Sequence, residues 1–281
     1  MAYIDSKGVR LFVEETGSGY PVVFVHEFGA DYREWELQVR FFSRQYRCIT
    51  FNARGYPPSD VPESLDDYGW EHSRDDIAAV LQGLSISHAH IVGLSMGAYA
   101  TLQFGLRYPE MASALVVAGV GSGSPPRLQK EWLAQSQAQG RAFSEQGIDA
   151  MARATAHGPT RIQLLKKDPR AWQQFVAHYR EHSAQGMGRT VSRYQALRPS
   201  LEESQAQLAA LTLPVLLAVG DEDEPCLETN AFLKRTIRSA GLWMCPNTGH
   251  AINLEEPAAF NAAVLDFFGA VERGRWPVRE A

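Results

Sequence analysis

The chain has 281 residues, of which 45% are hydrophobic and 21% charged. This size and balance are typical of a globular enzyme with one large α/β domain, or with a core domain and a modest insertion. A formal net charge of −5 argues against a nucleic-acid-binding protein, which usually carries a basic face. The sequence has no run long enough to span a membrane, and residues 1–7 lack the apolar stretch of a signal peptide. We therefore expect a cytoplasmic protein that binds neither nucleic acid nor membrane.

The cysteine content predicts a reduced protein without a metal site. Cys48, Cys226 and Cys245 are too few for a disulfide framework, and none belongs to a C-x-x-C pair. We expect all three to be buried as small apolar residues.

Short apolar or alternating runs predict strands in the first half of the chain. They cover residues 9–15, 21–25, 47–51, 88–94 and 114–118. Apolar residues at helical spacing predict helices between them, near residues 35–42, 77–84 and 98–108. Strands that alternate with helices in this way indicate a mostly parallel sheet with helices on both faces.

The pattern changes after residue 121. Residues 122–210 contain no convincing strand and fit several short helices, whereas strand patterns return at 213–220 and 241–245 before a last helix that begins near Pro257. We predict core segments at 1–121 and 211–281 and a helical lid at 122–210. This lid has more Lys and Arg than Asp and Glu, whereas the rest of the chain is acidic. A basic lid could attract an anionic substrate, or it could be only a solvated helical surface.

The most informative motif is Gly93–Gly97, which reads Gly-Leu-Ser-Met-Gly. It follows a predicted strand and opens a predicted helix, so Ser95 lies on a sharp bend that exposes its hydroxyl above the sheet. The N-terminus of the helix also directs N–H groups at any anion that forms near Ser95.

Ser95 needs a base and an acid to act as a nucleophile, and both occur downstream. Carboxylates at positions 221–224 follow the strand at 213–220, where parallel sheets place their sites, and His250 follows the last strand. The order serine, carboxylate, histidine is that of α/β-hydrolases.

The chain resembles the α/β-hydrolase superfamily over nearly its whole length, within the lidded group that includes esterases and carbon–carbon bond hydrolases. The matching motifs are Gly93–Gly97, the His26-x-x-Gly29 turn with Trp35 after it, Arg54-Gly55, Gly220-x-x-Asp223, and Gly249-His250 followed by Glu256-Pro257. The resemblance implies that Asp223 is the acid of the triad. It also implies that the backbone N–H groups of Phe28 and Met96 form the oxyanion hole.

Two positions depart from the pattern of the superfamily. Glu27 stands where glycine is usual, so its carboxylate could bind a cationic group, position a water or repel anionic substrates; a surface salt bridge is the alternative. Asn52 replaces an aspartate that would be a charge partner for Arg54, and we expect this change to alter the loop and not catalysis.

Several other residues have weaker interpretations. His26 is expected to be a hydrogen-bonded structural residue, and His88 and His90 to be partly exposed. Trp132 is a candidate substrate contact, although packing between lid and core explains it equally well. The lid histidines lack zinc-site spacing, and the chain lacks a glycine-rich nucleotide fingerprint, so no metal or cofactor is expected.

The resemblance implies hydrolysis of a small ester or similar acyl substrate by Ser95, His250 and Asp223. A serine at position 95 argues against dehalogenase or epoxide hydrolase chemistry, for which related folds use aspartate. Two alternatives stay open: hydrolysis of a carbon–carbon bond in a vinylogous diketone, and a ligand receptor or lyase that keeps the triad. Neither the oligomeric state nor the identity of the substrate follows from the sequence.

Overall fold

A computed structural model describes residues 2–280 and contains one eight-stranded sheet in the order β1-β2-β4-β3-β5-β6-β7-β8. β2 runs antiparallel to β1 and to β4, and all other neighbouring strands are parallel. The predicted mostly parallel α/β sheet is therefore confirmed. The strands are β1 (Ala2–Ser6), β2 (Val9–Thr16), β3 (Tyr20–Val25), β4 (Tyr46–Phe51), β5 (Ala89–Leu94), β6 (Ala112–Ala118), β7 (Val215–Gly220) and β8 (Ala240–Cys245).

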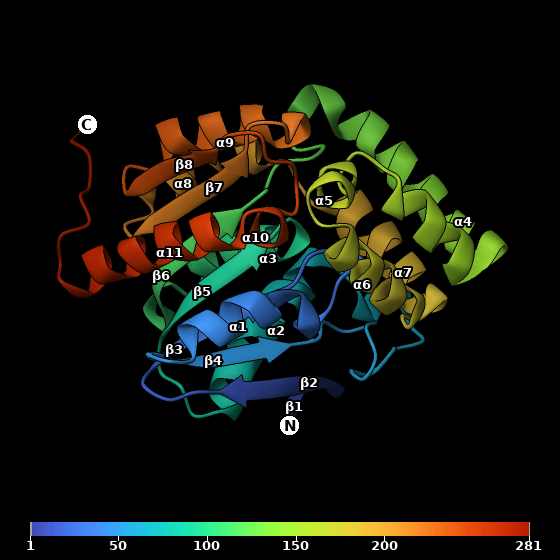
Figure 1. Cartoon of the computed structure of the whole chain (residues 1–281), viewed down its shortest axis with the longest axis horizontal. Coiled ribbons are helices and arrows are strands. Elements are labelled where there is room, and N and C mark those ends of the chain that lie inside the picture. The colour runs from blue at the N-terminus through green and yellow to red at the C-terminus, as the bar shows by residue number, and fades with distance from the viewer. Residues whose placement is uncertain (1, 281) are drawn as a thin grey trace.

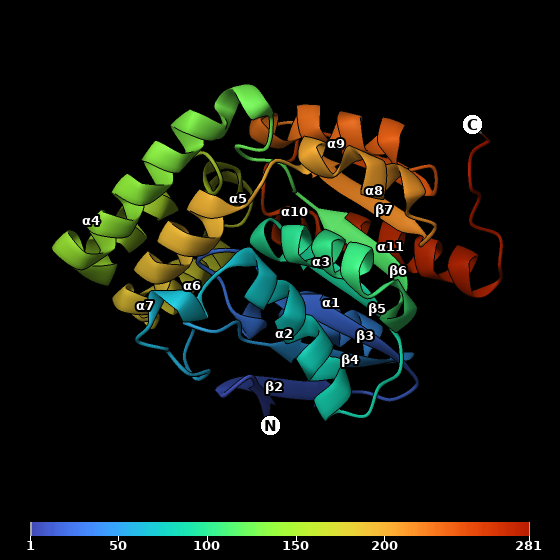
Figure 2. The same ribbon diagram turned by 180° about the vertical axis from the view of Figure 1, so that it is seen from behind.

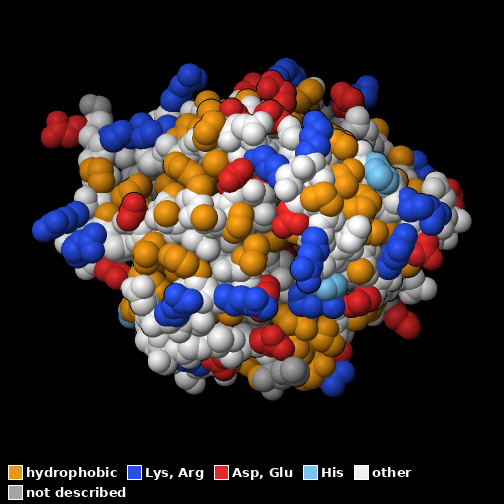
Figure 3. Space-filling view, in the orientation of Figure 1, with side chains coloured by type: hydrophobic (Ala, Val, Ile, Leu, Met, Phe, Trp, Pro, Cys, Tyr) orange, Lys and Arg blue, Asp and Glu red, His pale blue; other side chains and the backbone are white. Residues whose placement is uncertain are grey.

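Helices cover both faces of the sheet. One face carries α1 (Glu36–Phe42), α10 (Ile252–Glu255) and α11 (Pro257–Glu272) (Figure 1). The other carries α2 (Trp70–Gly83), α3 (Met96–Arg107) and α9 (Glu224–Thr236), with α8 (Gln205–Ala210) beside α9 (Figure 2). No helix among residues 2–280 is long and apolar enough to cross a membrane. Acidic and basic side chains are interspersed on the surface seen in Figure 3.

The apolar positions that predicted the helices are those that pack against the sheet. Trp35 and Phe42 meet Phe260 and Phe268 in a buried cluster on the α1 and α11 side. Ile77 of α2 belongs to the cluster on the opposite side. Burial of apolar surface on both faces, at about 25 cal/mol per Å², stabilises this arrangement.

The chain between β6 and β7 is helical, as its composition predicted. α4 (Gln129–Ala156), α5 (Ile162–Lys167), α6 (Pro169–Arg180) and α7 (Ala184–Thr190) lie beyond the edge of the sheet where the parallel strands end (Figure 1). A π-helix at Val191–Gln195 follows α7. Gly147 interrupts α4 with φ of 75°, a conformation that glycine adopts readily.

Two elements lack a clear pattern in the sequence. β1 is a half-exposed edge strand with polar residues, so neither alternation nor an apolar run indicates it. α9 begins with Glu224 and Pro225 and buries few apolar side chains, so its apolar periodicity is weak. In both segments, packing against the rest of the fold determines the secondary structure, and local propensity does not.

The expectation for His90 is wrong. His88 is exposed, but His90 is only 1% exposed because α11 covers the start of β5. Its ring stacks on Phe268 at 4.2 Å between centroids, and Nε2 lies 3.3 Å from Glu272. Burial lowers the pKa of His90 to about 4, so the ring packs as a neutral group.

Arg54 has a buried charge partner in spite of the change at position 52. Asp76 of α2 accepts from Arg54 Nε at 2.9 Å and from its terminal nitrogen at 2.6 Å, and both side chains are buried. Asn52 instead donates to the carbonyl of Pro57 at 2.7 Å and accepts from the N–H of Tyr32 at 2.8 Å. Asn52 therefore stabilises the loop, while α2 supplies the carboxylate.

Asp76→Asn should lower the free energy of unfolding by about 3 kcal/mol or more, because it leaves the buried Arg54 charge without a counterion. Urea denaturation followed by circular dichroism measures this change. Glu228→Gln is the matched control: it breaks the exposed pair with Arg127 and should cost less than about 1 kcal/mol. Equal effects of the two substitutions would contradict the prediction.

Candidate active site

Ser95 lies on a strained bend between β5 and α3. Its backbone has φ of 54° and ψ of −109°, a conformation that costs on the order of 1 to 3 kcal/mol for a residue with a side chain. Its N–H donates to the carbonyl of Ala118 at 2.8 Å. A Cβ at Gly93 would collide with Thr101, and one at Gly97 with the carbonyl of Val25. The two glycines therefore allow α3 to pack closely enough to force this bend.

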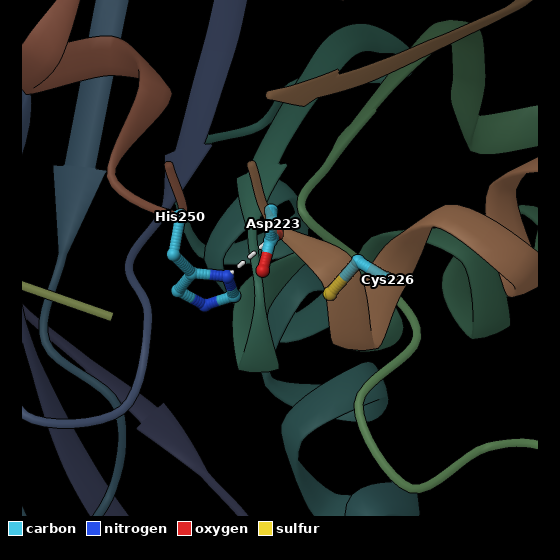
Figure 4. A group of neighbouring side chains, drawn as sticks. All are labelled: Asp223, Cys226 and His250. Carbon is cyan, nitrogen blue, oxygen red and sulfur yellow. Dashed lines mark hydrogen bonds and ion pairs between the residues drawn. The ribbon is translucent and has the colours of Figure 1, made fainter. Parts of the chain in front are cut away.

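His250 and Asp223 form a buried hydrogen-bonded pair at the same edge of the sheet (Figure 4). Asp223 immediately precedes α9, and His250 lies in the loop between β8 and α10. His250 Nδ1 and Asp223 Oδ2 are 2.8 Å apart, and both side chains are about 5% exposed or less. The neighbouring carboxylates Asp221 and Glu222 are exposed, so the carboxylate that meets the imidazole is Asp223.

The environment of this pair favours the charged imidazole. Burial alone would lower the pKa of His250, but the charge and hydrogen bond of Asp223 outweigh it and hold that pKa well above its ordinary value. Burial would likewise raise the pKa of Asp223, but His250 lowers it below its usual range. Because Nδ1 donates to Asp223, Nε2 is the nitrogen that can accept a further proton.

A cavity of about 450 Å³ brings the candidate residues together. Ser95, His250 and Phe28 line it, and so do the two candidate substrate contacts, Glu27 and Trp132. Among residues 2–280, the backbone N–H groups of Phe28 and Met96 have no hydrogen-bond acceptor. Two unpaired donors near a nucleophile are what an oxyanion needs.

Glu27 forms a buried ion pair, so the alternative of a surface salt bridge is wrong. Its carboxylate pairs with Arg161, which precedes α5, and the two side chains are 3% and 1% exposed. The second oxygen of Glu27 lies 3.6 Å from His250 Nε2. The guanidinium of Arg161 also stacks over Phe175 at 4.2 Å. The segment before α5 therefore packs directly onto the turn that follows β3.

Glu34 completes this cluster as the neutral member. Burial, followed by the negative charge of Glu27, raises the pKa of Glu34 well above its ordinary value. Burial would also raise the pKa of Glu27, but the positive charges of Arg161 and His250 lower it. Glu34 Oε2 accepts the N–H of Glu27 at 3.1 Å. The cluster thus contains one carboxylate, one carboxylic acid and one guanidinium.

Backbone hydrogen bonds hold the turns on which these residues lie. His26 Nε2 accepts from the N–H of Ala53 at 3.0 Å, and Nδ1 donates to the carbonyl of Glu27 at 2.8 Å, so His26 is structural as predicted. Glu255 accepts from the N–H groups of Gly249 and Ala251 at 2.7 and 3.2 Å, which fixes the loop of His250.

Sequence reasoning missed the roles of Arg161, Glu34 and Glu255. Only the Glu255-Glu256-Pro257 helix start marked one of them, and that pattern says nothing of the bonds to the His250 loop. No local sequence pattern distinguishes Arg161 from the other arginines of the predicted lid.

The three cysteines are buried, as predicted. Cys226 lies near Asp223 and His250, with one ligand atom from each within 4.8 Å of the others (Figure 4). Nδ1 of the imidazole is already bonded to Asp223, and the thiol of Cys226 donates to the carbonyl of Gly119 at 3.3 Å. Burial also raises the pKa of the Cys226 thiol. These three groups fit a hydrogen-bonded network and not a metal site.

Known proteins resemble the chain in sequence and in structure. A sequence model described as "Alpha/beta hydrolase family" matches residues 22–263. "Epoxide hydrolase 1" of Caenorhabditis elegans is 33% identical over 42% of this chain, a match that spans only 30% of that protein. "3-oxoadipate enol-lactonase 2" of Acinetobacter baylyi is 26% identical over 86% of each chain. The enol-lactonase structure from Burkholderia xenovorans LB400 superposes with a TM-score of 0.84 at 19% identity, over 95% of this chain and all of the other.

Glu27→Gln should lower the pKa of His250, because it removes a negative charge 3.6 Å from Nε2 and leaves Arg161 unpaired. NMR titration of labelled histidine side chains measures this pKa. Glu34→Gln is the control: Glu34 is already neutral, so the pKa of His250 should stay unchanged. A similar shift in both variants would contradict the assignment of the charge to Glu27.

Proposed function

The chain belongs to the alpha/beta hydrolase family, and on that premise we propose that it is a serine hydrolase that cleaves a carboxylic ester or a similar small acyl substrate. The observation that carries this proposal is the cavity at which a strained Ser95 and a His250–Asp223 pair meet. The relatives of the chain include a protein named as an enol-lactonase, and that name is consistent with acyl chemistry. A serine at position 95, and not an aspartate, argues against epoxide opening.

In the first half of the proposed reaction, Ser95 Oγ attacks the carbonyl carbon while its proton moves to His250 Nε2. Asp223 stabilises the imidazolium that results. The N–H groups of Phe28 and Met96 bind the oxyanion, each worth about 3 to 4 kcal/mol. Collapse of the tetrahedral intermediate breaks the ester bond, and the leaving alkoxide takes the proton from His250. The acyl group is then bonded to Ser95.

In the second half, a water replaces the alcohol. His250 Nε2 removes a proton from this water as its oxygen attacks the acyl carbon. The second tetrahedral intermediate expels Ser95, which regains its proton from His250. The products are a carboxylic acid and an alcohol.

We assign residues 122–210 as a lid that closes this site. Arg161 of the lid pairs with Glu27 on the turn after β3, and Trp132 lines the cavity from α4. The pair gives Glu27 a positioning role: its charge is matched by Arg161, and it stabilises the imidazolium from the side opposite Asp223. Exclusion of water by such a lid strengthens each of these interactions.

Ser95→Ala should lower hydrolysis of 4-nitrophenyl esters by about a millionfold, since the nucleophile is lost. It should also abolish covalent labelling by a fluorophosphonate, which intact-mass spectrometry detects. Ser122→Ala is the matched control, because Ser122 lines the same cavity and should leave both readouts intact. Labelling that persists in Ser95→Ala would overturn the mechanism.

Turnover of a vinylogous diketone, but of no ester, would favour carbon–carbon bond cleavage. Stable ligand retention without turnover would favour a receptor.

Asp223→Asn should lower kcat by about 10⁴-fold, because the amide cannot hold the imidazole in the required tautomer or stabilise its charge. Steady-state kinetics on the same esters measures the loss. Asp221→Asn is the control: its exposed side chain accepts the N–H of Thr248, and kcat should stay within about threefold, well under the 1.4 kcal/mol that a tenfold change represents. A larger loss in Asp221→Asn than in Asp223→Asn would contradict the assigned acid.

A further inference from the structure

Three arginines are buried in the described chain, and one of them lacks a counterion. Arg54, Arg161 and Arg198 are 3%, 1% and 6% exposed. Arg54 pairs with Asp76, and Arg161 with Glu27. Among residues 2–280, no carboxylate oxygen lies within 4.0 Å of the Arg198 guanidinium. Burial of a charge without a counterion is energetically costly, so the retention of Arg198 needs a reason.

The surroundings of Arg198 hold its guanidinium without neutralising it. Its Cζ lies 4.8 Å from the ring centre of Trp132 and 5.2 Å from that of Tyr99. One terminal nitrogen donates to the carbonyl of Ser122 at 2.5 Å. Burial lowers the pKa of Arg198, and only tyrosines and Cys226 act in the opposite direction. Aromatic rings cover the flat faces of a guanidinium and leave its N–H edge for acceptors in its plane.

Arg198 borders the same cavity as Ser95 and His250. The other charged side chains that line this cavity already have a charged or hydrogen-bonded partner. Glu27 and Arg161 neutralise one another, and Glu131 is exposed and bound to Gln135 at 2.8 Å. Arg198 is thus the one buried, unmatched charge that lines the cavity among the described residues.

Trp132, one of the two rings beside Arg198, is itself held in place by a hydrogen bond. The indole N–H of Trp132 donates to the carbonyl of Gln195, the last residue of the π-helix. Arg198 follows this π-helix by three residues. π-helical turns are uncommon and often occur at functional sites.

We propose that Arg198 binds a carboxylate of the substrate, so that the preferred substrates are esters or lactones that carry a free carboxylate. A carboxylate matches the planar N–H fork of arginine and supplies the missing counterion inside the cavity. This proposal rests on the proposed function of the site. It makes Arg198 the residue that determines specificity, while Ser95, His250 and Asp223 perform the chemistry.

The test compares substrates that differ only in charge. Mono-4-nitrophenyl succinate, glutarate and adipate carry the carboxylate on the acyl side, and acetyl esters of 3-hydroxypropionate and 4-hydroxybutyrate carry it on the alcohol side. Each is paired with its methyl ester, and kcat/KM is measured for both. The wild type should favour at least one carboxylate over its methyl ester by about tenfold or more, the strength of a charge-assisted hydrogen bond.

Arg198→Gln should abolish this preference, so that the ratio of kcat/KM between each carboxylate and its methyl ester falls by about tenfold or more. Arg198→Lys should retain part of it. Arg193→Gln is the matched control, because Arg193 is also a lid arginine but pairs with the exposed Asp66; its preference should equal that of the wild type. Circular dichroism checks that each variant is folded.

Three outcomes would overturn the proposal. One is a wild type that favours the neutral ester in every pair, a result that does not depend on whether Arg198→Gln folds. Another is an Arg198→Gln variant that keeps the preference. If the wild type hydrolyses neither ester, the proposed function fails instead; calorimetric titration with glutarate and adipate then tests the anion site alone. Binding lost in Arg198→Gln would support it, and no binding to the wild type would overturn it.

Discussion

The site depends on one backbone constraint, the left-handed conformation forced on Ser95. The chain must turn from β5 into α3 within a single residue, and it can do so only because Gly93 and Gly97 let the helix approach β3 and β5 without a side chain between them. The bend fixes three things together: the exposure of the hydroxyl, the direction of the Met96 N–H, and the start of α3 beside the turn that bears Phe28. The strain is offset by the apolar layers on both faces of the sheet.

A second feature of the site is that its buried carboxyl groups have pKa values shifted in opposite directions. His250 lowers the pKa of Asp223, and Arg161 and His250 lower that of Glu27, whereas burial and the charge of Glu27 raise the pKa of Glu34 well above its ordinary value. The imidazole of His250 therefore lies between two negative charges, one at Nδ1 and one near Nε2. Such an arrangement favours the imidazolium that the proposed reaction forms. It also increases the fraction of His250 that is protonated before substrate binds.

The sequence was informative where chemistry or periodicity constrains single positions. Gly93–Gly97 predicted the bend, and the strand at 213–220 placed the carboxylates of residues 221–224 at the edge of the sheet. The choice of Asp223 among them came from the family resemblance. The sequence was uninformative where partners come from distant segments. The pairing of Arg161 with Glu27 joins the lid to the turn after β3, and Arg54 finds Asp76 on α2; neither leaves a local pattern. His90 was misjudged for the same reason, because its cover comes from α11, far along the chain.

The ion pair between Arg161 and Glu27 also bears on how a molecule reaches the cavity. If the segment before α5 swung away from the sheet, each half of the pair would lose its counterion while Phe175 lost its guanidinium neighbour. That loss opposes a hinged opening at this corner of the lid. Exposed residues line the cavity on several sides: Glu131 and Gln135 belong to α4, Pro159 precedes α5, and Pro225 lies in the first turn of α9. The Arg161–Glu27 pair therefore holds the chain before α5 in place as one wall of the cavity, and the carboxylate of Glu131 lies at the exposed edge of the same cavity.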